Sequence, residues 1–292
     1  MFKGLSAFPI TPSDADGVVQ TDALQRILAR LEGSGVASVG LLGSTGTYMF
    51  LSRAERQRAV AAAREVLTDL PLIVGVGAMR TSEAVALAKD AQAAGADALL
   101  MAPVSYNPLT EEEVAQHYMA VAAATDLPFC IYNNPGTTNF TFSYALLARL
   151  AQIDTVQAVK MPLPADGDFK AVMEALPDHL EVGFSGDWGM GDAFLSGAGS
   201  FYSAIAGTLP APLVALVEAA VAGDAARVQA LSDELSVLWD LCKTVGSVRV
   251  AHALAREMGL ITTSLPRPLL DLDGAARAQV RGLAQQFGVD AG

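Results

Sequence analysis

The sequence has little of what metal, disulfide or hydrolase chemistry requires. Its 292 residues include only two cysteines and three histidines. Cys130 lies in an apolar run and Cys242 in a helical one, neither with metal-ligand or C-x-x-C spacing, so we expect both to be buried and reduced. His117, His179 and His252 form no H-x-x-x-H pair, and no Ser/His/Asp set falls at strand ends. We therefore predict no metal site, no catalytic triad and no cofactor.

Basic residues are also scarce, with 19 Lys and Arg against 31 Asp and Glu and a formal net charge of −12. Such a surface argues against nucleic acid and anionic membranes as partners, although a small anionic substrate needs only a local positive site. Apolar runs are too short or too broken by Gly and Pro for a membrane span. The N-terminus, MFKGLSAFPITP, has no signal-peptide layout. We expect a cytoplasmic protein.

The dominant pattern is an alternation of short apolar runs and amphipathic helical segments. Such alternation indicates parallel strands, and eight in regular succession favour an α/β fold of the closed (β/α)8 TIM-barrel type. An open doubly wound sheet usually carries a Gly-rich dinucleotide fingerprint after its first strand. The segment TPSDADG in that place has none. The expected strands are 4–10, 37–43, 71–77, 96–103, 128–133, 156–161, 181–186 and 200–206.

Helical patterns separate these strands and then take over the chain. Several open on Ser or Thr with Glu close behind, which is typical of a capped N-terminus. From about residue 212 no further strand is expected. We predict a catalytic barrel over residues 1–222 followed by a C-terminal helical region over 223–292. The expected helices include 21–35, 52–67, 81–95, 110–124 and, in the tail, segments within 212–244, 247–258 and 274–287.

One lysine stands inside an apolar strand. Residues 156–162 read V-Q-A-V-K-M-P, and no acidic residue lies within three positions of Lys160. Burial disfavours the ammonium form, and a neutral amine can attack a ketone to form a Schiff base. In a barrel, catalytic side chains lie at the C-terminal ends of strands, where Lys160 falls. The alternative is a lysine that extends its ammonium to solvent.

Other candidates follow other expected strands. Tyr132, in C-I-Y-N-N-P-G, can move protons or be only a core aromatic. The turn G-S-T-G (43–46) can hold a carboxylate on its backbone N–H groups or be an ordinary strand-to-helix turn. Tyr106 is a functional tyrosine or a loop aromatic at a subunit contact. Asp187 and Trp188, in F-S-G-D-W-G, can line the barrel mouth or cap the next helix, and we expect Asp187 to act as the cap.

Four motifs occur in a fixed order: G-S-T-G (43–46), Y-N-x-P (132–135), V-K (159–160) and S-G-D (185–187). Together with P-L-I-V-G-V-G (71–77) and A-G-A-D-A-L-L-M-A-P (94–103), they resemble the dihydrodipicolinate synthase / N-acetylneuraminate lyase family. The resemblance runs from about residue 4 to 210, and a helical tail of the expected kind follows it.

The resemblance implies a class I aldolase-type enzyme. Lys160 would form the Schiff base and Tyr132 would relay protons, with Ser44 in the relay. Tyr106 would complete the relay from a neighbouring subunit, which implies a homo-oligomer, a dimer or the tetramer usual in the family. Substrate contacts are expected from the carboxylate cradle and from later strand ends, namely Gly43, Ser44, Thr45, Thr137, Gly186 and Ser203.

Two positions depart from the family pattern. Thr137 stands where dihydrodipicolinate synthases carry an arginine two residues after the proline of Y-N-x-P. A threonine offers no bidentate cationic grip for a carboxylate. Thr47 stands where the cradle motif usually ends in Glu. Both changes affect the second-substrate end of the pocket and argue against a true dihydrodipicolinate synthase.

We therefore predict a Schiff-base-forming lyase, an aldolase or a dehydratase, that acts on a small 2-oxo acid of the pyruvate type. A 2-oxo-3-deoxy sugar acid or a 4-hydroxy-2-oxo acid would be suitable. The alternative is a 4-hydroxy-tetrahydrodipicolinate synthase, which joins pyruvate and aspartate semialdehyde. A less favoured alternative is a non-catalytic barrel that binds a keto acid.

Overall fold

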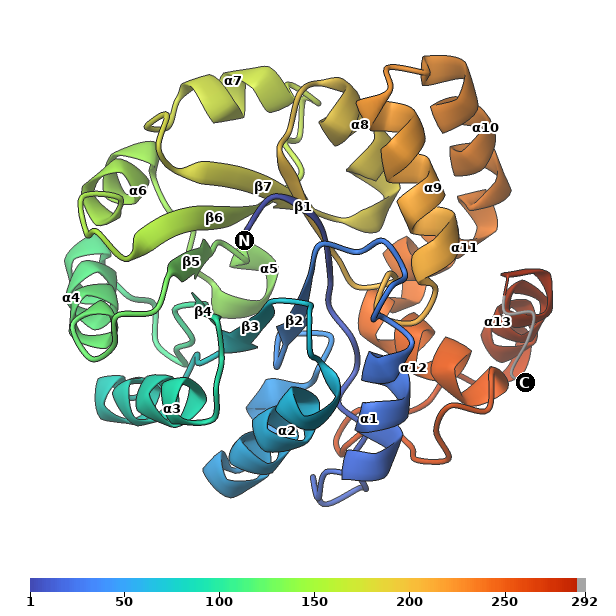
Figure 1. Ribbon diagram of the computed structural model, residues 1–292, viewed down its shortest axis with the longest axis horizontal. Coiled ribbons are helices and arrows are strands. Elements are labelled where there is room, and N and C mark those ends of the chain that lie inside the picture. Colours follow the sequence, from blue (N-terminus) through green and yellow to red (C-terminus); the bar gives the residue numbers. More distant parts are fainter. Residues whose placement is uncertain (288–292) are drawn as a thin grey trace.

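The chain folds into a closed barrel of eight parallel strands, as Figure 1 shows for the computed structural model, which describes residues 1–287. The strand β1 pairs with β8 to close it, with Ala7 opposite Ser203. The predicted TIM barrel is confirmed. The strands are β1 Gly4–Ala7, β2 Ser38–Leu41, β3 Leu72–Gly75, β4 Ala98–Met101, β5 Phe129–Tyr132, β6 Val156–Pro162, β7 Glu181–Ser185 and β8 Ser200–Ser203.

Side chains alternate between the two faces of each strand, and this alternation builds two separate apolar layers. The outward layer packs against the helices as one large cluster. The inward layer is a smaller cluster inside the barrel, formed by Phe2, Phe8, Ile73, Ala98, Leu100, Ala102, Cys130, Tyr132, Ala158 and Tyr202. Any polar side chain on the inward face is therefore enclosed by the barrel.

The barrel helices form an outer ring, except for one short helix. The ring contains α1 Thr21–Ala29, α2 Arg53–Val66, α3 Thr81–Ala93, α4 Glu111–Ala122, α6 Tyr144–Leu150, α7 Phe169–Glu174 and α8 Met190–Leu195. The short α5 (Pro135–Thr138) lies beside β5 near the barrel axis in Figure 1. Two 3₁₀ turns, η1 Tyr48–Phe50 and η2 Asp187–Gly189, also follow strands directly.

Helix starts follow the predicted capping pattern in part. Ser52 accepts a hydrogen bond from the Glu55 N–H at the start of α2. Thr110 and Glu113 form a reciprocal capping box at the start of α4. No side chain caps α1 or α3. The capping signal therefore located two of these four helix starts, and apolar periodicity accounts for the others.

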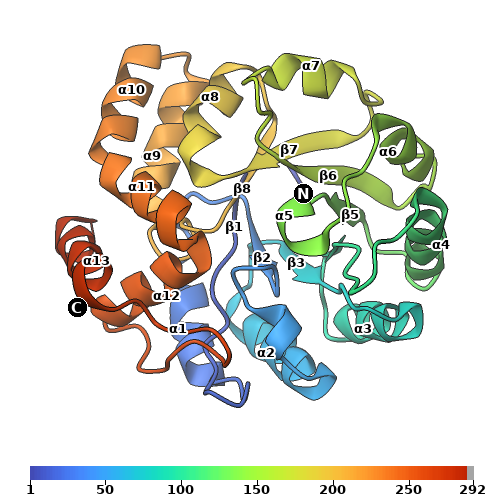
Figure 2. The same cartoon turned by 180° about the vertical axis from the view of Figure 1, so that it is seen from behind.

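The C-terminal helices pack on one side of the barrel. Figures 1 and 2 both show them next to α1 and α8. Arg30, directly after α1, donates to the Thr208 carbonyl at 3.1 Å. The division at residue 222 stays a prediction, and residues 288–292 of the predicted tail lie outside the described residues. The helices are α9 Pro210–Val221, α10 Ala225–Glu234, α11 Ser236–Val245, α12 Ser247–Glu257 and α13 Gly274–Phe287.

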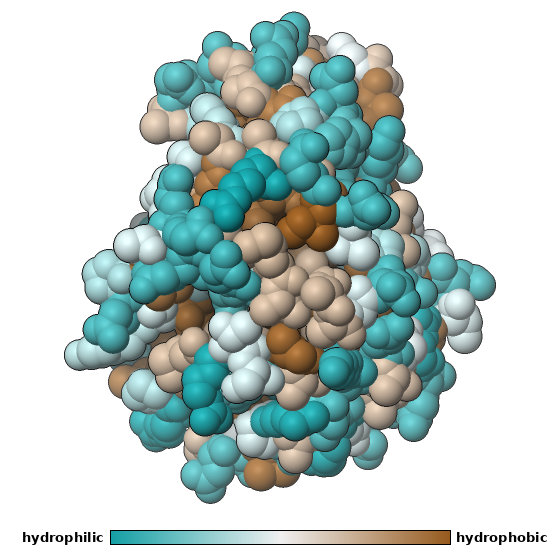
Figure 3. Space-filling view, turned by 90° about the vertical axis from the view of Figure 1, so that its left-hand side faces the viewer, coloured by the Kyte–Doolittle hydropathy of each residue, from teal (hydrophilic) through white to brown (hydrophobic). Residues whose placement is uncertain are grey.

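The surface is hydrophilic with local apolar areas. Figure 3 views the side that carries α3, α4 and α6, where hydrophobic atoms gather in a central area with hydrophilic residues around them. Among residues 1–287, no helix has the length and apolarity needed to cross a bilayer.

Candidate active site

The strand alternation of β6 turns Lys160 into the barrel. Ala158 belongs to the inward layer, and Lys160, two residues later, lies on the same face. Only 5% of its surface is exposed. Tyr132 of β5 is its partner on one side and Gly183 of β7 on the other. The predicted alternative, a lysine that reaches solvent, is wrong.

Three aromatic rings surround the Lys160 amine. Its Nζ lies 4.3 Å from the ring centroid of Phe8, 4.7 Å from that of Tyr132 and 5.5 Å from that of Tyr202. Glycine at position 40 makes room for Phe8, because a Cβ there would come within 2.3 Å of the ring. The faces of aromatic rings attract a cation, but they replace its hydration shell only in part. The rings thus enclose the amine, and within residues 1–287 no carboxylate forms a salt bridge with it.

Burial shifts the protonation of both central groups. It lowers the pKa of Lys160 to about 8, although the charge of Asp187 acts in the opposite direction. It raises the pKa of Tyr132 to about 12, although the hydrogen bond from Ser44 opposes that change. A substantial fraction of Lys160 is therefore a neutral nucleophile near pH 8, while Tyr132 keeps its proton.

The hydroxyls of Ser44 and Tyr132 face each other across the barrel mouth. Ser44 Oγ lies 3.3 Å from the Tyr132 hydroxyl oxygen, although 88 residues separate them in the chain. The Asn134 amide donates to both, at 3.0 Å to Tyr132 and 3.4 Å to Ser44. These contacts form a chain of polar groups that begins beside the Lys160 amine.

The G-S-T-G turn after β2 is built on an unusual backbone. Leu42, directly before it, has φ of 58° and Thr47, directly after it, has φ of 51°. Gly75 of β3 permits this path, because a Cβ there would lie 1.9 Å from the Leu42 carbonyl oxygen. Gly43 and Thr45 are buried in this turn, and Ser44 is half-buried. The strained backbone therefore lies at the predicted carboxylate cradle, next to the hydrogen-bonded side chains of Ser44, Tyr132 and Asn134.

Asp187 does not cap a helix, so that expectation is wrong. Its buried carboxylate accepts hydrogen bonds from the Ser203 hydroxyl and from the N–H groups of Ala204 and Ile205, both at 3.3 Å. Burial raises the pKa of Asp187, and the Ser203 hydrogen bond acts against this shift. Because β7 and β8 pair in parallel, Asp187 after β7 lies next to the end of β8 and the segment after it, which supply these donors.

The remaining predicted residues have different surroundings. Gly186 has φ of 117°, a conformation that favours glycine, and leads into the Asp187 turn. The Ser203 hydroxyl is engaged by Asp187 and by the Ala206 N–H. Thr137 is exposed on α5, and its hydroxyl donates to the Asn134 carbonyl. Tyr106 is 90% exposed and lies apart from the Lys160 group in this chain.

Sequence reasoning missed several residues at this site. Asn134 was only the unassigned position of the Y-N-x-P motif, and its amide reaches Ser44 only through the tertiary fold. Phe8 and Tyr202 were counted as strand residues, yet both rings border the Lys160 amine. The usable signal was their position, since each aromatic lies at or just beyond the C-terminal end of a barrel strand.

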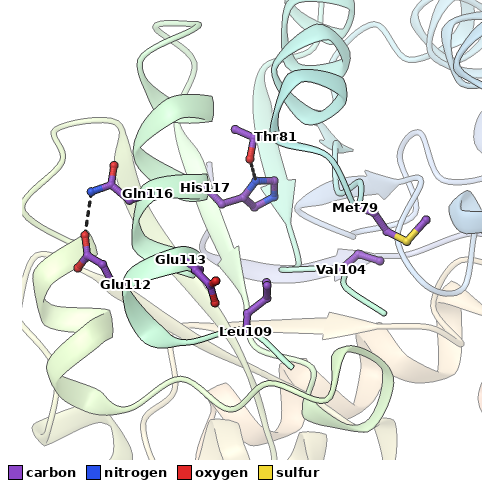
Figure 4. A pocket seen from close by; sticks show the side chains of 8 residues that line it. All are labelled: Met79, Thr81, Val104, Leu109, Glu112, Glu113, Gln116 and His117. Atoms are coloured by element: carbon purple, nitrogen blue, oxygen red, sulfur yellow. Dashed lines mark hydrogen bonds between the residues drawn. The ribbon is translucent and has the colours of Figure 1, made fainter. Parts of the chain in front are cut away.

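Both cysteines are free and buried, as expected. Among residues 1–287 no group of three His, Cys, Asp or Glu side chains could hold a metal. A surface pocket of about 410 Å³ lies elsewhere, between the start of α3 and α4 (Figure 4). In it the Thr81 hydroxyl and the His117 ring nitrogen lie 2.9 Å apart. It includes neither Lys160 nor Tyr132, being lined by Met79, Thr81, Val104, Leu109, Glu112, Glu113, Gln116 and His117.

Comparisons with known proteins agree with this geometry. The family model described as the Dihydrodipicolinate synthetase family matches residues 1–287. A relative from Alcanivorax borkumensis, named 4-hydroxy-tetrahydrodipicolinate synthase, is 32% identical over 99% of both chains. One of the same name from Methylococcus capsulatus is 33% identical, over 99% of this chain and 100% of the relative.

Two crystal structures are also similar. One, described as dihydrodipicolinate synthase from Agrobacterium tumefaciens, is 52% identical, with a TM-score of 0.95 over 98% of both chains. Another, a chloride-inhibited dihydrodipicolinate synthase from Acinetobacter baumannii complexed with pyruvate, is 30% identical. Its TM-score is 0.90, over 99% of this chain and 100% of that one.

Proposed function

Because this chain belongs to the dihydrodipicolinate synthetase family, we propose that its buried Lys160 forms a Schiff base with a pyruvate-type 2-oxo acid and that Tyr132 and Ser44 move the protons. The family membership confirms the resemblance seen in the motifs and the predicted class, a class I aldolase-type lyase. The observation that carries the residue assignment is the aromatic enclosure of Lys160 beside the polar chain that starts at Tyr132.

The first step is addition to the ketone. The substrate carboxylate binds at the turn 43–46, and the C2 carbonyl faces Lys160. The neutral amine attacks C2, and a proton passes from nitrogen to the carbonyl oxygen to give a carbinolamine. The pKa of about 8 supports this role, because burial leaves a far larger fraction of the amine unprotonated near neutral pH than in an ordinary lysine.

The second step removes water. The Tyr132 hydroxyl gives its proton to the carbinolamine hydroxyl, the C2–O bond breaks, and water leaves. The products are an iminium cation on Lys160 and a phenolate on Tyr132. Ser44, 3.3 Å from the Tyr132 oxygen, shares the proton. General acid–base assistance of this kind typically contributes about 10²–10⁴-fold.

The third step uses the iminium as an electron sink. In aldol cleavage, the Tyr132 phenolate takes the proton of a C4 hydroxyl, the C3–C4 bond breaks, and its electrons form an enamine of pyruvate while an aldehyde leaves. In dehydration, the Tyr132 phenolate takes a proton from C3 to give the enamine; Tyr132 then returns the proton to the C4 hydroxyl, the C4–O bond breaks, and water leaves an unsaturated iminium. The same residues serve both reactions.

The synthase reaction is the second candidate. The relatives from Alcanivorax borkumensis and Methylococcus capsulatus carry the name 4-hydroxy-tetrahydrodipicolinate synthase, which favours it. Thr137 is the observation against it, because it is exposed on α5 and lacks the charge that would bind a second carboxylate. Mixing the protein with pyruvate and aspartate semialdehyde tests this candidate. Turnover at the rate of pyruvate-adduct formation would favour the synthase.

We also propose a homo-oligomer, a dimer or a tetramer, in the cytoplasm. The supporting observation is Tyr106, an aromatic that is 90% exposed on the loop after β4. In an oligomer this ring can enter a neighbouring subunit and complete its relay. Mixing inactive Tyr106→Phe and Tyr132→Phe chains should restore part of the activity, since one subunit type then has both tyrosines at its site.

Reduction with borohydride in the presence of pyruvate tests the proposed function directly. We expect a reduced pyruvate adduct on Lys160, located by peptide mass mapping. An unmodified Lys160, or an adduct at another lysine, would contradict the proposal. A screen of 2-oxo-3-deoxy sugar acids and 4-hydroxy-2-oxo acids, assayed for pyruvate release or dehydration, then identifies the reaction.

A further inference from the structure

The amide of Asn134 joins the two hydroxyls of the proposed relay. Asn134 follows Tyr132 by two residues, and its Nδ2 lies 3.0 Å from the Tyr132 hydroxyl oxygen. The same nitrogen lies 3.4 Å from Ser44 Oγ, on the far side of the barrel mouth. A primary amide carries two N–H donors, so one side chain can serve both oxygens.

The backbone holds this amide in place. The Asn134 carbonyl accepts hydrogen bonds from the N–H groups of Thr137 and Thr138, at 3.0 and 3.1 Å. The Thr138 hydroxyl donates to it as well, at 3.0 Å. Pro135 disfavours the α-helical region for the residue before it, and Asn134 lies outside that region, with φ of −133° and ψ of 70°. The direction of the side chain is therefore fixed before any substrate binds.

We propose that Asn134 is a positioning residue of the proton relay: its amide donates to the Tyr132 oxygen, directs the phenol proton toward the substrate, and stabilises the phenolate left when that proton departs. This inference rests on the proposed Schiff-base function. A donor binds an anionic oxygen more strongly than a neutral one, so its effect is largest when the phenolate forms.

The chemical step shows where the charge develops. Tyr132 gives its proton to the carbinolamine hydroxyl, water departs with the broken C2–O bond, and an iminium and a phenolate remain. Burial makes that phenolate costly, since it raises the pKa of Tyr132 to about 12. The titratable groups that face Tyr132 are Lys160 of β6 and Tyr48 of η1. Burial raises the pKa of Tyr48, so that group stays neutral, and Asn134 supplies a neutral donor to the Tyr132 oxygen.

The test uses pyruvate as the probe, which requires no second substrate. Borohydride trapping measures how much adduct forms on Lys160. Exchange of the pyruvate methyl hydrogens for deuterium, followed by NMR in deuterium oxide, measures proton removal from C3 of the iminium. We expect Asn134→Leu, which has a similar shape but no donor, to slow this exchange about 10- to 100-fold. The amount of adduct at equilibrium should fall as well, because the same donor stabilises the phenolate that accompanies the iminium.

The variant Asn134→Asp distinguishes a role of this residue in the proton relay from a role in forming the turn. Aspartate suits the turn as well as asparagine but presents a charged acceptor to the phenolate. We therefore expect slower exchange than with Asn134→Leu at neutral pH. Its rate relative to the unaltered protein should recover as the pH falls toward about 4, where a protonated carboxyl can donate. Asn139→Gly is the matched control, because Asn139 ends the same short helix with φ of 54° and is exposed.

Two results would overturn the inference. One is exchange by Asn134→Leu within about twofold of the unaltered protein. The other is Asn134→Asp exchanging faster than Asn134→Leu at neutral pH, which would indicate a turn-forming role. If the unaltered protein forms no adduct on Lys160, the proposed function fails instead, so the two failures are distinguishable.

Discussion

The two ends of the proposed pocket are built differently. At the pyruvate end, Lys160 and Tyr132 lie on neighbouring strands, are buried, and are held by the sheet register. At the far end, Thr137 lies exposed on the four-residue helix α5. We therefore propose that reactivity depends on burial, which the barrel fixes, whereas selectivity depends on the exposed turn at α5, which can change without disturbing the core.

Removing the nucleophile should have the largest effect. We expect Lys160→Met to abolish the pyruvate adduct and to slow methyl-hydrogen exchange by at least about 10³-fold. Lys170 is exposed on α7, and Lys170→Met is the control: it should keep both adduct formation and methyl-hydrogen exchange. If Lys160→Met still formed the adduct, the assignment of Lys160 as the nucleophile would be wrong.

The same variant should be more stable. The pKa of Lys160 is about 8 in the folded protein, against 10.5 for an ordinary lysine. Because the folded value is lowered, the cost of the buried ammonium is fully present below about pH 8 and disappears above 10.5. Denaturant unfolding of Lys160→Met at pH 7 should show a gain of up to about 3 kcal/mol, which shrinks toward pH 10.5.

Removing the Tyr132 hydroxyl should have the next largest effect. Tyr132→Phe keeps the ring beside Lys160 but loses the bonds to Ser44 and Asn134. We expect methyl-hydrogen exchange to fall about 10²–10⁴-fold while trapped adduct still accumulates slowly. Tyr144→Phe, on α6 and partly exposed, provides the comparison. Equal loss in both variants would argue for a general structural effect.

The charge of Asp187 should set the pH dependence. That charge raises the pKa of Lys160, so removing it lets the pKa fall further. We expect Asp187→Asn to move the midpoint of adduct formation down from about 8 by about one pH unit, measured by borohydride trapping across a pH series. An unmoved midpoint would show that the two groups are uncoupled. Asp192→Asn, exposed on α8, should leave it in place.

The smallest effect is expected at the exposed end. Thr137→Arg supplies the bidentate donor that a second carboxylate requires, and should raise condensation of pyruvate with aspartate semialdehyde about tenfold. Thr137→Lys adds the same charge without the planar fork, and should gain less. If lysine served equally well, charge rather than geometry would control this end of the pocket.

Local patterns were sufficient for most of the fold. The eight apolar runs contained all eight strands, with β6 extending only one residue further, to Pro162. The last helix, α13, has the predicted bounds, Gly274–Phe287. The short elements α5 and η1 were missed, because a single turn has no periodicity to detect.

The site was less predictable where it depends on contacts distant in sequence. Lys160 is visible from its own strand, because a charge among apolar residues contradicts the pattern. Asp187 was assigned to a helix cap because its partners, Ser203 and Ile205, follow a different strand. Asn134 gave no local signal, since its contact with Ser44 spans 90 residues.

The exposure of Tyr106 also implies that specific activity depends on the concentration of the enzyme. If a neighbouring copy supplies this ring, the working unit exists only while subunits stay associated, and its abundance follows mass action. Specific activity would then fall on dilution below the subunit dissociation constant, with no change in the fold of any single chain. A cell holding few copies would have disproportionately little activity.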